Sequence, residues 1–352
     1  MLYSSPMLIS ALLGLAASAN AIGGTWENAT SLMGAPRQWH GAAQRASADL
    51  VVVGGIIRSA SGGYESTDIT QFYNLKANGW IDFPPIPIKI NHPNTGGVFQ
   101  YYDQLHSNSI YVLGGLATGS DGIQHAVANG FKLDAPRGED QWTTVASIPK
   151  GSERGGAAVG VYNDLIVLAG GLRTFDISKG LGDTIASVVA YNLTQNKWVP
   201  LPSKAQNLPD ARDHAGAAVV DGVFYVIGGS KNNVDNVQNT VFSLDLKNLA
   251  NGWTNNKETL PTARSGLTAA AVNGVIYAFG GEGNTVGNTK GIFSAVEAFD
   301  TKSRKWTKLP PMPVPRHGSA AVTLATDRIY VPGGANAEGV HPTTANAVFY
   351  PS

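Results

Sequence analysis

The segment from Leu208 to Val220 contains two side chains whose spacing suggests chemistry. Arg212 and His214 stand two positions apart, between a proline-containing turn and a run of small residues. A guanidinium group can bind a planar anion through paired hydrogen bonds, and an imidazole can exchange a proton near neutral pH. The segment therefore suits either anion binding or acid–base catalysis.

Arginine recurs at the same place in an internal repeat of the chain. Four more arginines stand, like Arg212, at a nearly constant distance before a glycine pair: Arg37, Arg154, Arg264 and Arg316. One interpretation is structural, in which each guanidinium bonds carbonyl groups of the neighbouring repeat's turn. The other is a cationic rim for carboxylates, sulfates or sugar acids. The second repeat departs from the pattern, with His92, Pro93 and Asn94 where the arginine is expected.

The glycine pairs recur about every 55 residues, which is the period of a propeller blade rather than of a helical solenoid. Six pairs follow apolar, strand-like runs, at residues 54–55, 114–115, 170–171, 228–229, 280–281 and 333–334. A tryptophan follows five of the pairs at a nearly constant spacing, namely Trp80, Trp142, Trp198, Trp253 and Trp306. Glycine lets strand backbones approach closely, and an indole fills the gap between neighbouring wedge-shaped sheets.

These glycine pairs and phased tryptophans together resemble the kelch repeat, in six copies over residues 22–352. The resemblance implies an all-β fold, a six-bladed kelch-type β-propeller that forms a single domain. The sixth copy ends before its tryptophan, whereas Trp26 stands unmatched near the N-terminus. We therefore expect the N-terminal segment to supply the outer strand of the last blade, which closes the ring and removes the sheet edges.

The segment 1–21 has the pattern of a secretory signal peptide. An apolar run from Met7 to Ala17 precedes small residues that fit cleavage near residue 19 or 21. The run is too short for a membrane anchor, which needs about 20 apolar residues. We therefore expect a secreted, extracellular protein, with sequons for N-glycosylation at Asn28 and Asn192.

Composition excludes several classes of protein and site. The formal net charge is zero and only 14% of residues are charged, which argues against nucleic acid or a membrane surface as a partner. The chain has no cysteine, so disulfides, thiolate metal ligands and a cysteine nucleophile are excluded. No closely spaced histidine pair is present, so we expect no metal site. We also expect no cofactor and a monomeric protein.

The expected strand order places the candidate residues on one face. Because the first two strands of a blade are antiparallel, the loop entering the first and the loop leaving the second lie on the same side. Six of the seven histidines map to these loops: His40, His92, His125, His214, His317 and His341. The ligand-binding candidates on this face are Arg37, Arg154, Arg173, Arg212, His214, Arg264, Glu282, Arg316 and His317.

We expect the chain to bind a carbohydrate or a small anionic molecule in a funnel lined by these arginine and histidine loops. The alternative is a cofactor-independent isomerase, epimerase or cyclase, with His214, His317 or Glu282 as catalytic candidates. The sequence thus leaves open whether the protein is an enzyme. A third alternative is an extracellular scaffold for protein interactions.

The kelch resemblance bears on each of these alternatives. Copper-radical oxidases similar to galactose oxidase need a tyrosine cross-linked to cysteine, which this chain cannot form. Bacterial kelch enzymes that epimerise sialic acid resemble the chain in blade number and in the arginines around the funnel. Kelch substrate adaptors bind acidic peptides through arginines at positions similar to Arg212 and Arg173, so an acidic peptide is a further candidate ligand.

Overall fold

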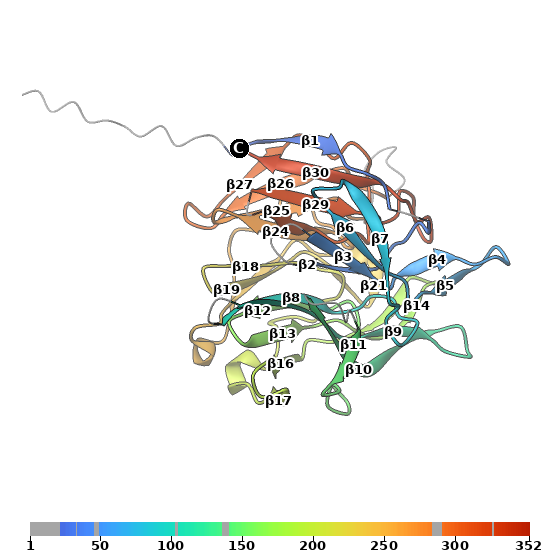
Figure 1. The fold of residues 1–352 in the computed structure, drawn as a ribbon. Helices are drawn as coiled ribbons and strands as arrows, with labels where there is room; N and C mark the ends of the chain where they lie inside the picture. Colours follow the sequence, from blue (N-terminus) through green and yellow to red (C-terminus); the bar gives the residue numbers. More distant parts are fainter. Residues whose placement is uncertain are drawn as a thin grey trace, which may run out of the picture.

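The computed structural model describes residues 22–32, 34–45, 49–102, 105–135, 141–283, 291–325 and 327–352, with the main chain alone at 45, 98–102, 105–108 and 135. The expected signal peptide, residues 1–21, lies outside the described residues. The chain forms antiparallel β-strands and two short 3₁₀ helices, η1 (Ser203–Ala205) and η2 (Leu249–Asn251) (Figure 1). The expected all-β class is therefore confirmed, and no membrane-spanning helix is found in the described ranges.

Most of the described chain belongs to groups of four antiparallel strands. In chain order, the first group is β2 (Gly41–Arg45), β3 (Asp49–Val53), β6 (Thr70–Asn74) and β7 (Gly79–Phe83). The second group is β8 (Thr95–Tyr102), β9 (Leu105–Thr118), β10 (Gln124–Ala135) and β11 (Trp142–Val145). The third group is β12 (Ala158–Tyr162), β13 (Leu165–Ala169), β16 (Val188–Asn192) and β17 (Lys197–Val199). The fourth group is β18 (Gly216–Val220), β19 (Val223–Ile227), β22 (Val241–Asp245) and β23 (Trp253–Asn255). The fifth group is β24 (Thr268–Val272), β25 (Val275–Phe279), β26 (Val296–Asp300) and β27 (Lys305–Leu309). The sixth group is β28 (Val322–Leu324), β29 (Arg328–Pro332), β30 (Asn346–Pro351) and β1 (Gly24–Asn28).

The second strand of each group is rich in β-branched and aromatic residues and is buried. Such residues suit a pleated surface that packs on both sides. Phe224 of β19, for example, has no exposed surface and packs in one cluster with Val167 of β13 and Leu244 of β22. The apolar core therefore lies between neighbouring sheets rather than inside any one of them.

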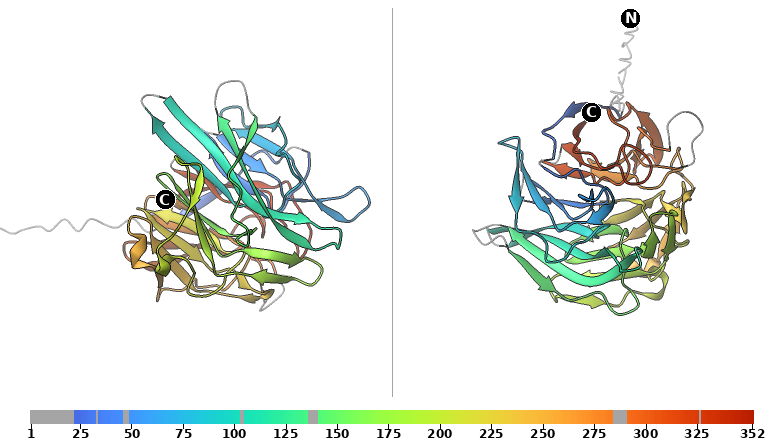
Figure 2. Two further views of the ribbon diagram at one scale, coloured as in Figure 1. Left: turned by 90° about the horizontal axis from the view of Figure 1, so that it is seen from below. Right: turned by 90° about the vertical axis from the view of Figure 1, so that its right-hand side faces the viewer.

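The first strands of the groups contact one another in cyclic order. β2 contacts β8, and the contacts continue through β12, β18, β24 and β28 back to β2. Their small residues let the strands converge near a common axis, and the other strands of each sheet extend outward from it (Figure 2). The loops that enter the first strands thus come together at one end of this axis.

Short strands form in three of the loops that leave the second strands of the groups. They form the hairpins β4 (Ile56–Arg58) with β5 (Tyr64–Ser66), β14 (Leu172–Asp176) with β15 (Leu181–Thr184), and β20 (Ser230–Lys231) with β21 (Asn233–Val237). The end of β10 pairs with β14, and β15 pairs with β21, so the β14–β15 and β20–β21 hairpins join β10 in one continuous ladder, whereas β4 and β5 form a separate sheet. This ladder forms a wall on the side of the molecule where the candidate residues were expected.

The N-terminal strand pairs with the C-terminal strand. β1 lies antiparallel to β30, with Trp26 opposite Phe349 (Figure 1). The Trp26 indole packs on Phe279 and Phe349, with ring centroids 5.5 and 5.0 Å away. Residues 22–28 therefore occupy the outer position of the last sheet.

The tryptophans of the outer strands connect neighbouring sheets. In five of the six outer strands the indole Nε1 donates a hydrogen bond to a carbonyl that follows the outer strand of the preceding sheet: Trp80 to Thr30, Trp142 to Pro84, Trp198 to Ala146, Trp253 to Ala205, and Trp26 to Pro310. Nε1 of Trp306, in β27, is buried without a partner among the described residues. Trp26 makes the same link as the tryptophans of the internal repeats. The repeated indole thus has a structural role in joining the sheets.

Candidate functional site

The five repeated arginines are buried inside the sheets. Arg37, Arg154, Arg212, Arg264 and Arg316 are each 0 or 1% exposed. Their guanidinium groups bond to their own sheet and not to the neighbouring repeat's turn. Nη1 of Arg316 donates to the carbonyls of Val331 and Ala345 at 3.0 and 2.9 Å, and Nη1 of Arg264 donates to Glu297 at 2.6 Å. Burial lowers the pKa of Arg316 to about 10.

The main-chain carbonyls at the same positions connect each sheet to the one before it. The N–H of Gly171 donates to Arg212 at 2.8 Å, and that of Gly281 donates to Arg316 at 2.8 Å. In the second repeat the equivalent acceptor is Ile90, which bonds to Gly55 at 2.8 Å. Ile90 therefore holds the arginine position, and the placement of His92 to Asn94 there was wrong. Strands β8 and β9 are longer than their counterparts, which displaces the glycine pair along the chain.

Two residues beyond the arginine position, six residues form a ring of main-chain hydrogen bonds around the axis. The N–H of each residue donates to the carbonyl of the equivalent residue in the preceding repeat, at 2.6 to 3.3 Å. The six bonds run from His92 to Trp39, Gly156 to His92, His214 to Gly156, Gly266 to His214, Gly318 to Gly266, and Trp39 to Gly318. All six residues have φ between 47° and 61°, a conformation that favours glycine. Three repeats nevertheless place a large aromatic ring here.

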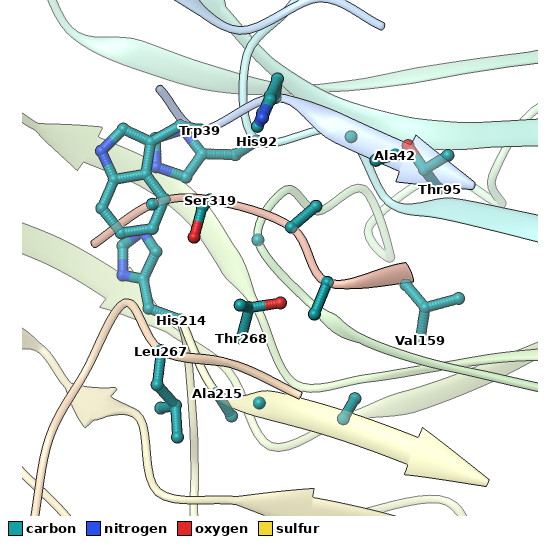
Figure 3. A pocket seen from close by; sticks show the side chains of 18 of the residues that line it. Trp39, Ala42, His92, Thr95, Val159, His214, Ala215, Leu267, Thr268 and Ser319 are labelled. Atoms are coloured by element: carbon teal, nitrogen blue, oxygen red, sulfur yellow. The ribbon is translucent and has the colours of Figure 1, made fainter. Parts of the chain in front are cut away.

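These three rings form an aromatic layer across the axis, made of Trp39, His92 and His214. Trp39 stacks on His92 with centroids 4.7 Å apart and an interplanar angle of 20°, and it lies 4.4 Å from His214. The rings gather at one end of the cavity drawn in Figure 3. His92 and His214 occupy equivalent positions in their repeats.

Each histidine of the aromatic layer is held by its preceding residue. Nδ1 of His214 donates to the Asp213 carboxylate at 2.7 Å, and Asp213 also accepts from the Ser230 hydroxyl at 2.6 Å. Nδ1 of His92 donates to the Asn91 side-chain oxygen at 2.5 Å. The partner that orients His214 is therefore Asp213 rather than Arg212.

An axial cavity of about 250 Å³ lies on one side of the aromatic layer. Small residues of the first strands line it, including Ala42, Thr95, Ala217 and Thr268, together with His92 and His214 (Figure 3). Glycine and alanine residues of these strands, among them Gly41, Gly216 and Ala269, leave the space open. The cavity carries few groups able to orient a ligand apart from the histidines at its end.

An outer cavity of about 270 Å³ lies among the loops. Trp39 lines this cavity as well as the axial one, so its indole separates the two spaces. Apolar side chains form much of the wall: Phe175, Ile177, Val234 and Val340. Ionisable groups line it too: Lys179, Asp235, Glu282, His317 and Glu338.

Glu282 and His317 form a buried ion pair in the outer cavity. Oε1 of Glu282 lies 3.2 Å from Nδ1 of His317, and their side chains are 12% and 1% exposed. Burial by itself opposes the charge on both groups, but their mutual attraction prevails. It raises the pKa of His317 and lowers that of Glu282 from their ordinary values. Nε2 of His317 bonds to the Ala337 carbonyl at 3.0 Å, which fixes the ring.

The structure brings only part of the expected site together. Glu282 and His317 share the outer cavity, while His214 lines the axial one. None of the five buried arginines lines either of these two cavities within the described residues. Arg173 is exposed on β14, where its guanidinium pairs with Asp183 at 2.7 Å.

The two sequons have different surroundings. Asn28 is exposed at the end of β1. The side chain of Asn192 donates to Asp164 at 2.8 Å and accepts from the Gln195 N–H at 2.8 Å. Asn74, without a sequon, caps the matching turn of another repeat by accepting from Ala77 at 2.8 Å. Asn192 therefore serves its hairpin turn as a structural cap.

Sequence reasoning missed Trp39, Asn91 and Asp213. Trp39 stands two residues after Arg37, as His214 stands two residues after Arg212. Aligning the repeats at the arginine would have revealed that large aromatic residues replace glycine at this position. Asn91 and Asp213 carry no such signal, because only their contacts reveal that they orient the histidines.

A family model described as the KLHDC2/KLHL20/DRC7 Kelch-repeats domain matches residues 161–346. The kelch-like protein terF of Aspergillus terreus is 33% identical over 316 residues, which cover 90% of this chain and 65% of terF. An N-acetylneuraminate epimerase of Brucella suis is 33% identical over 135 residues, covering 38% of this chain and 33% of the epimerase. The chain thus spans less than two thirds of the length of these relatives.

The solved structure of YjhT superposes with a TM-score of 0.69. The two chains are 14% identical, and the match covers 91% of this chain and 96% of YjhT. At this identity the likeness concerns the fold, and it agrees with a propeller built from antiparallel sheets.

Proposed function

Because this chain belongs to the kelch-repeat family, we propose that it is a six-bladed β-propeller that binds a small carbohydrate in its outer cavity. The buried Glu282–His317 pair, set in a partly apolar cavity of about 270 Å³, carries this proposal. Ligand sites of this kind combine apolar walls with a few fixed polar groups. The epimerase relative, whose name refers to a sugar acid, supports the choice of carbohydrate as ligand class.

The lining favours a neutral sugar over an anion. Asp235, Glu282 and Glu338 contribute carboxylates, and the lysine of the described lining, Lys179, already pairs with Asp176 at 2.8 Å. Carboxylates accept hydrogen bonds from sugar hydroxyls but repel a negative charge. The indole of Trp39 and the ring of Phe175 offer surfaces on which the apolar face of a sugar ring can pack.

The proposed propeller comprises residues 22–352 as one domain, with β1 as the outer strand of the last blade. The pairing of β1 with β30 and the link from Trp26 to Pro310 support this arrangement. A chain of this design is exported after removal of residues 1–21 and acts outside the cell as a monomer. The apolar run and the cleavage motif at its N-terminus support that localisation.

Catalysis on the bound sugar is the second candidate function. Glu282 and His317 are in contact and can act as a general base and a general acid. Such a pair can move a proton between two positions of a substrate. An epimerase or isomerase needs no more than this and an oriented ligand. This candidate adds a proton-transfer step to the binding reaction proposed for the same cavity.

A thermal-shift screen with neutral sugars, sugar acids and short acidic peptides tests the binding proposal. We expect neutral sugars to raise the melting temperature, because a ligand that binds only the folded state stabilises it. The Phe175→Ala variant should lose this shift, and Arg173→Ala, which alters an exposed ion pair away from the cavity, should keep it. A shift produced only by acidic peptides or sugar acids would contradict the proposal.

A further inference from the structure

Two imidazole nitrogens in the aromatic layer have no hydrogen-bond partner among the described residues. Nε2 of His92 and Nε2 of His214 are both buried without one, and the two residues are 4 and 5% exposed. Because each Nδ1 donates to a neighbouring oxygen, each Nε2 carries a free electron pair. A buried acceptor without a partner is destabilising, so natural sequences usually supply a partner for it.

The backbone at these histidines is also unfavourable. His92 and His214 have φ of 47° and 49°, whereas glycine fills the equivalent position in three other repeats. A bulky residue in this region of φ is strained. Such strain is typical of positions whose side chain has a task beyond packing.

The Cδ2–Nε2 edges of His92 and His214 both face the unfilled space beside Gly156. A methyl group added at Gly156 would lie 3.6 Å from Cδ2 of His92, 3.7 Å from Cδ2 of His214 and 3.8 Å from Nε2 of His214. In each ring Cδ2 is bonded to Nε2, so each imidazole presents the ring edge that carries its unpartnered nitrogen to this place. Gly156 lines the axial cavity with both histidines, and its missing side chain leaves room there.

From this geometry we propose that His92 and His214 together bind one divalent transition-metal ion beside Gly156. Two imidazoles that bind a tetrahedral ion at about 2.0–2.1 Å have ring centroids roughly 5 Å apart, and the centroids of these two lie 4.9 Å apart. Imidazole nitrogen suits Cu²⁺ and Zn²⁺, and Cu²⁺ binds such sites most tightly. Water or a ligand in the axial cavity completes the coordination.

The surroundings of the two histidines match those of metal ligands. Histidines that bind metals usually donate their other N–H to a carboxylate, an amide or a carbonyl, which fixes the ring. Asp213 and Asn91 do this here, and Trp39 packs on both rings.

The proposed site has two protein ligands. No cluster of three or more histidine, aspartate or glutamate side chains suited to a metal occurs in the described part of the chain. A site with two imidazoles leaves coordination positions open, as sites that act on a ligand do. It is distinct from the outer cavity, since the Trp39 indole lies between the two spaces.

Titration of the full chain with Cu²⁺ and Zn²⁺, followed by calorimetry and by electron paramagnetic resonance for Cu²⁺, tests the proposal. We expect one Cu²⁺ per chain with two coordinated imidazole nitrogens. His92→Gly and His214→Gly should each lower the affinity at least 10-fold and remove one imidazole signal. Glycine is chosen because it fills the same position in three repeats, so these variants keep the backbone conformation.

His125→Gly, at an exposed histidine paired with Asp121, is the matched control and should leave the affinity unchanged. Asp213→Asn should weaken Cu²⁺ binding about 10- to 100-fold, as losses of such orienting partners do. Anomalous diffraction from Cu²⁺-soaked crystals should place the ion beside Gly156, even if a variant folds poorly. Binding that survives in both His92→Gly and His214→Gly, or an ion found elsewhere, would overturn the proposal.

Discussion

At the scale of single residues, burial separates side chains of the same type into different roles. Arg212 and Arg173 looked alike as candidates, yet the first is 1% exposed and the second pairs with Asp183 at the surface. A buried guanidinium must satisfy its donors within the protein, because an unpaired buried charge is costly. The repeated arginines meet this requirement in part: each bonds within its own sheet, but Nε and Nη1 of Arg212 and Nε and Nη2 of Arg316 have no partner among the described residues. The cavities are lined instead by glutamate, histidine and aromatic side chains.

The Glu282–His317 pair predicts a pH-dependent contribution to stability. The pKa of His317 is raised above 6.5, so its contribution is complete below 6.5 and is lost as the pH rises through the raised value. The pKa of Glu282 is lowered below 4.5, so its contribution is complete above 4.5 and is lost as the pH falls through the lowered value. The pair therefore stabilises the protein most between pH 4.5 and 6.5.

Glu282→Gln should lower the free energy of unfolding by about 3 kcal/mol in this window, because it leaves the buried His317 without its counter-charge. The deficit should shrink toward alkaline and toward strongly acidic pH. Urea unfolding at a series of pH values measures it. Glu338→Gln, at a carboxylate of the same lining that raises the pKa of His317 less than Glu282 does, should show a smaller deficit, and an equal pH profile for both variants would refute the role of the pair.

At the scale of elements, the glycine pairs set how closely the repeats approach. Gly280 follows β25 with φ of 56°, and a methyl group there would collide with the carbonyl of Arg316 in the next repeat. Gly274, in the turn between β24 and β25, has φ of 82° but no atom closer than 4.0 Å to such a methyl group. One glycine thus serves a turn, and the other serves a contact between sheets.

Gly280→Ala should therefore destabilise the protein far more than Gly274→Ala. Both variants carry the cost of a left-handed conformation, about 1–2 kcal/mol. Gly280→Ala must also displace the neighbouring backbone, which brings the loss to about 3 kcal/mol or more. Chemical denaturation of the two variants measures the difference, and equal losses would mean that the sheets are not held at this contact.

At the scale of the whole molecule, the ends of the chain meet in one sheet. β1 completes the group of β28, β29 and β30, and Trp26 packs on Phe279 of the preceding sheet. In the proposed propeller β1 closes the ring, and a strand in that position stabilises more than its own contacts, since it removes exposed edges and unites the first and last units.

Deleting residues 22–30 from the mature chain should lower the melting temperature by roughly 10 °C or more, through loss of this pairing and of Trp26. Calorimetry should still show one transition if the remaining sheets unfold together. Trp26→Ala and Trp80→Ala serve as matched variants, since both indoles link neighbouring sheets. A truncated chain that melts like the intact one would show that β1 is dispensable.

The sequence by itself determined the all-β class, the kelch-type repeat and the position of each glycine pair. These features depend on local chemistry: glycine where φ is positive, β-branched residues in central strands, and a tryptophan at a nearly constant spacing. The unmatched Trp26 likewise predicted the role of the N-terminal segment, because a repeat with one part missing at its end needs that part from elsewhere.

Only the tertiary structure decided which candidate residues meet and which are buried. Trp39, His92 and His214 come from three repeats and touch because their loops converge on one axis, and the longer β8–β9 hairpin concealed their common register. The arginines share one motif but lie inside the sheets. Burial and partnership depend on residues distant in the chain, so side-chain type and spacing could not separate the arginines of the framework from the histidines and glutamate of the cavities.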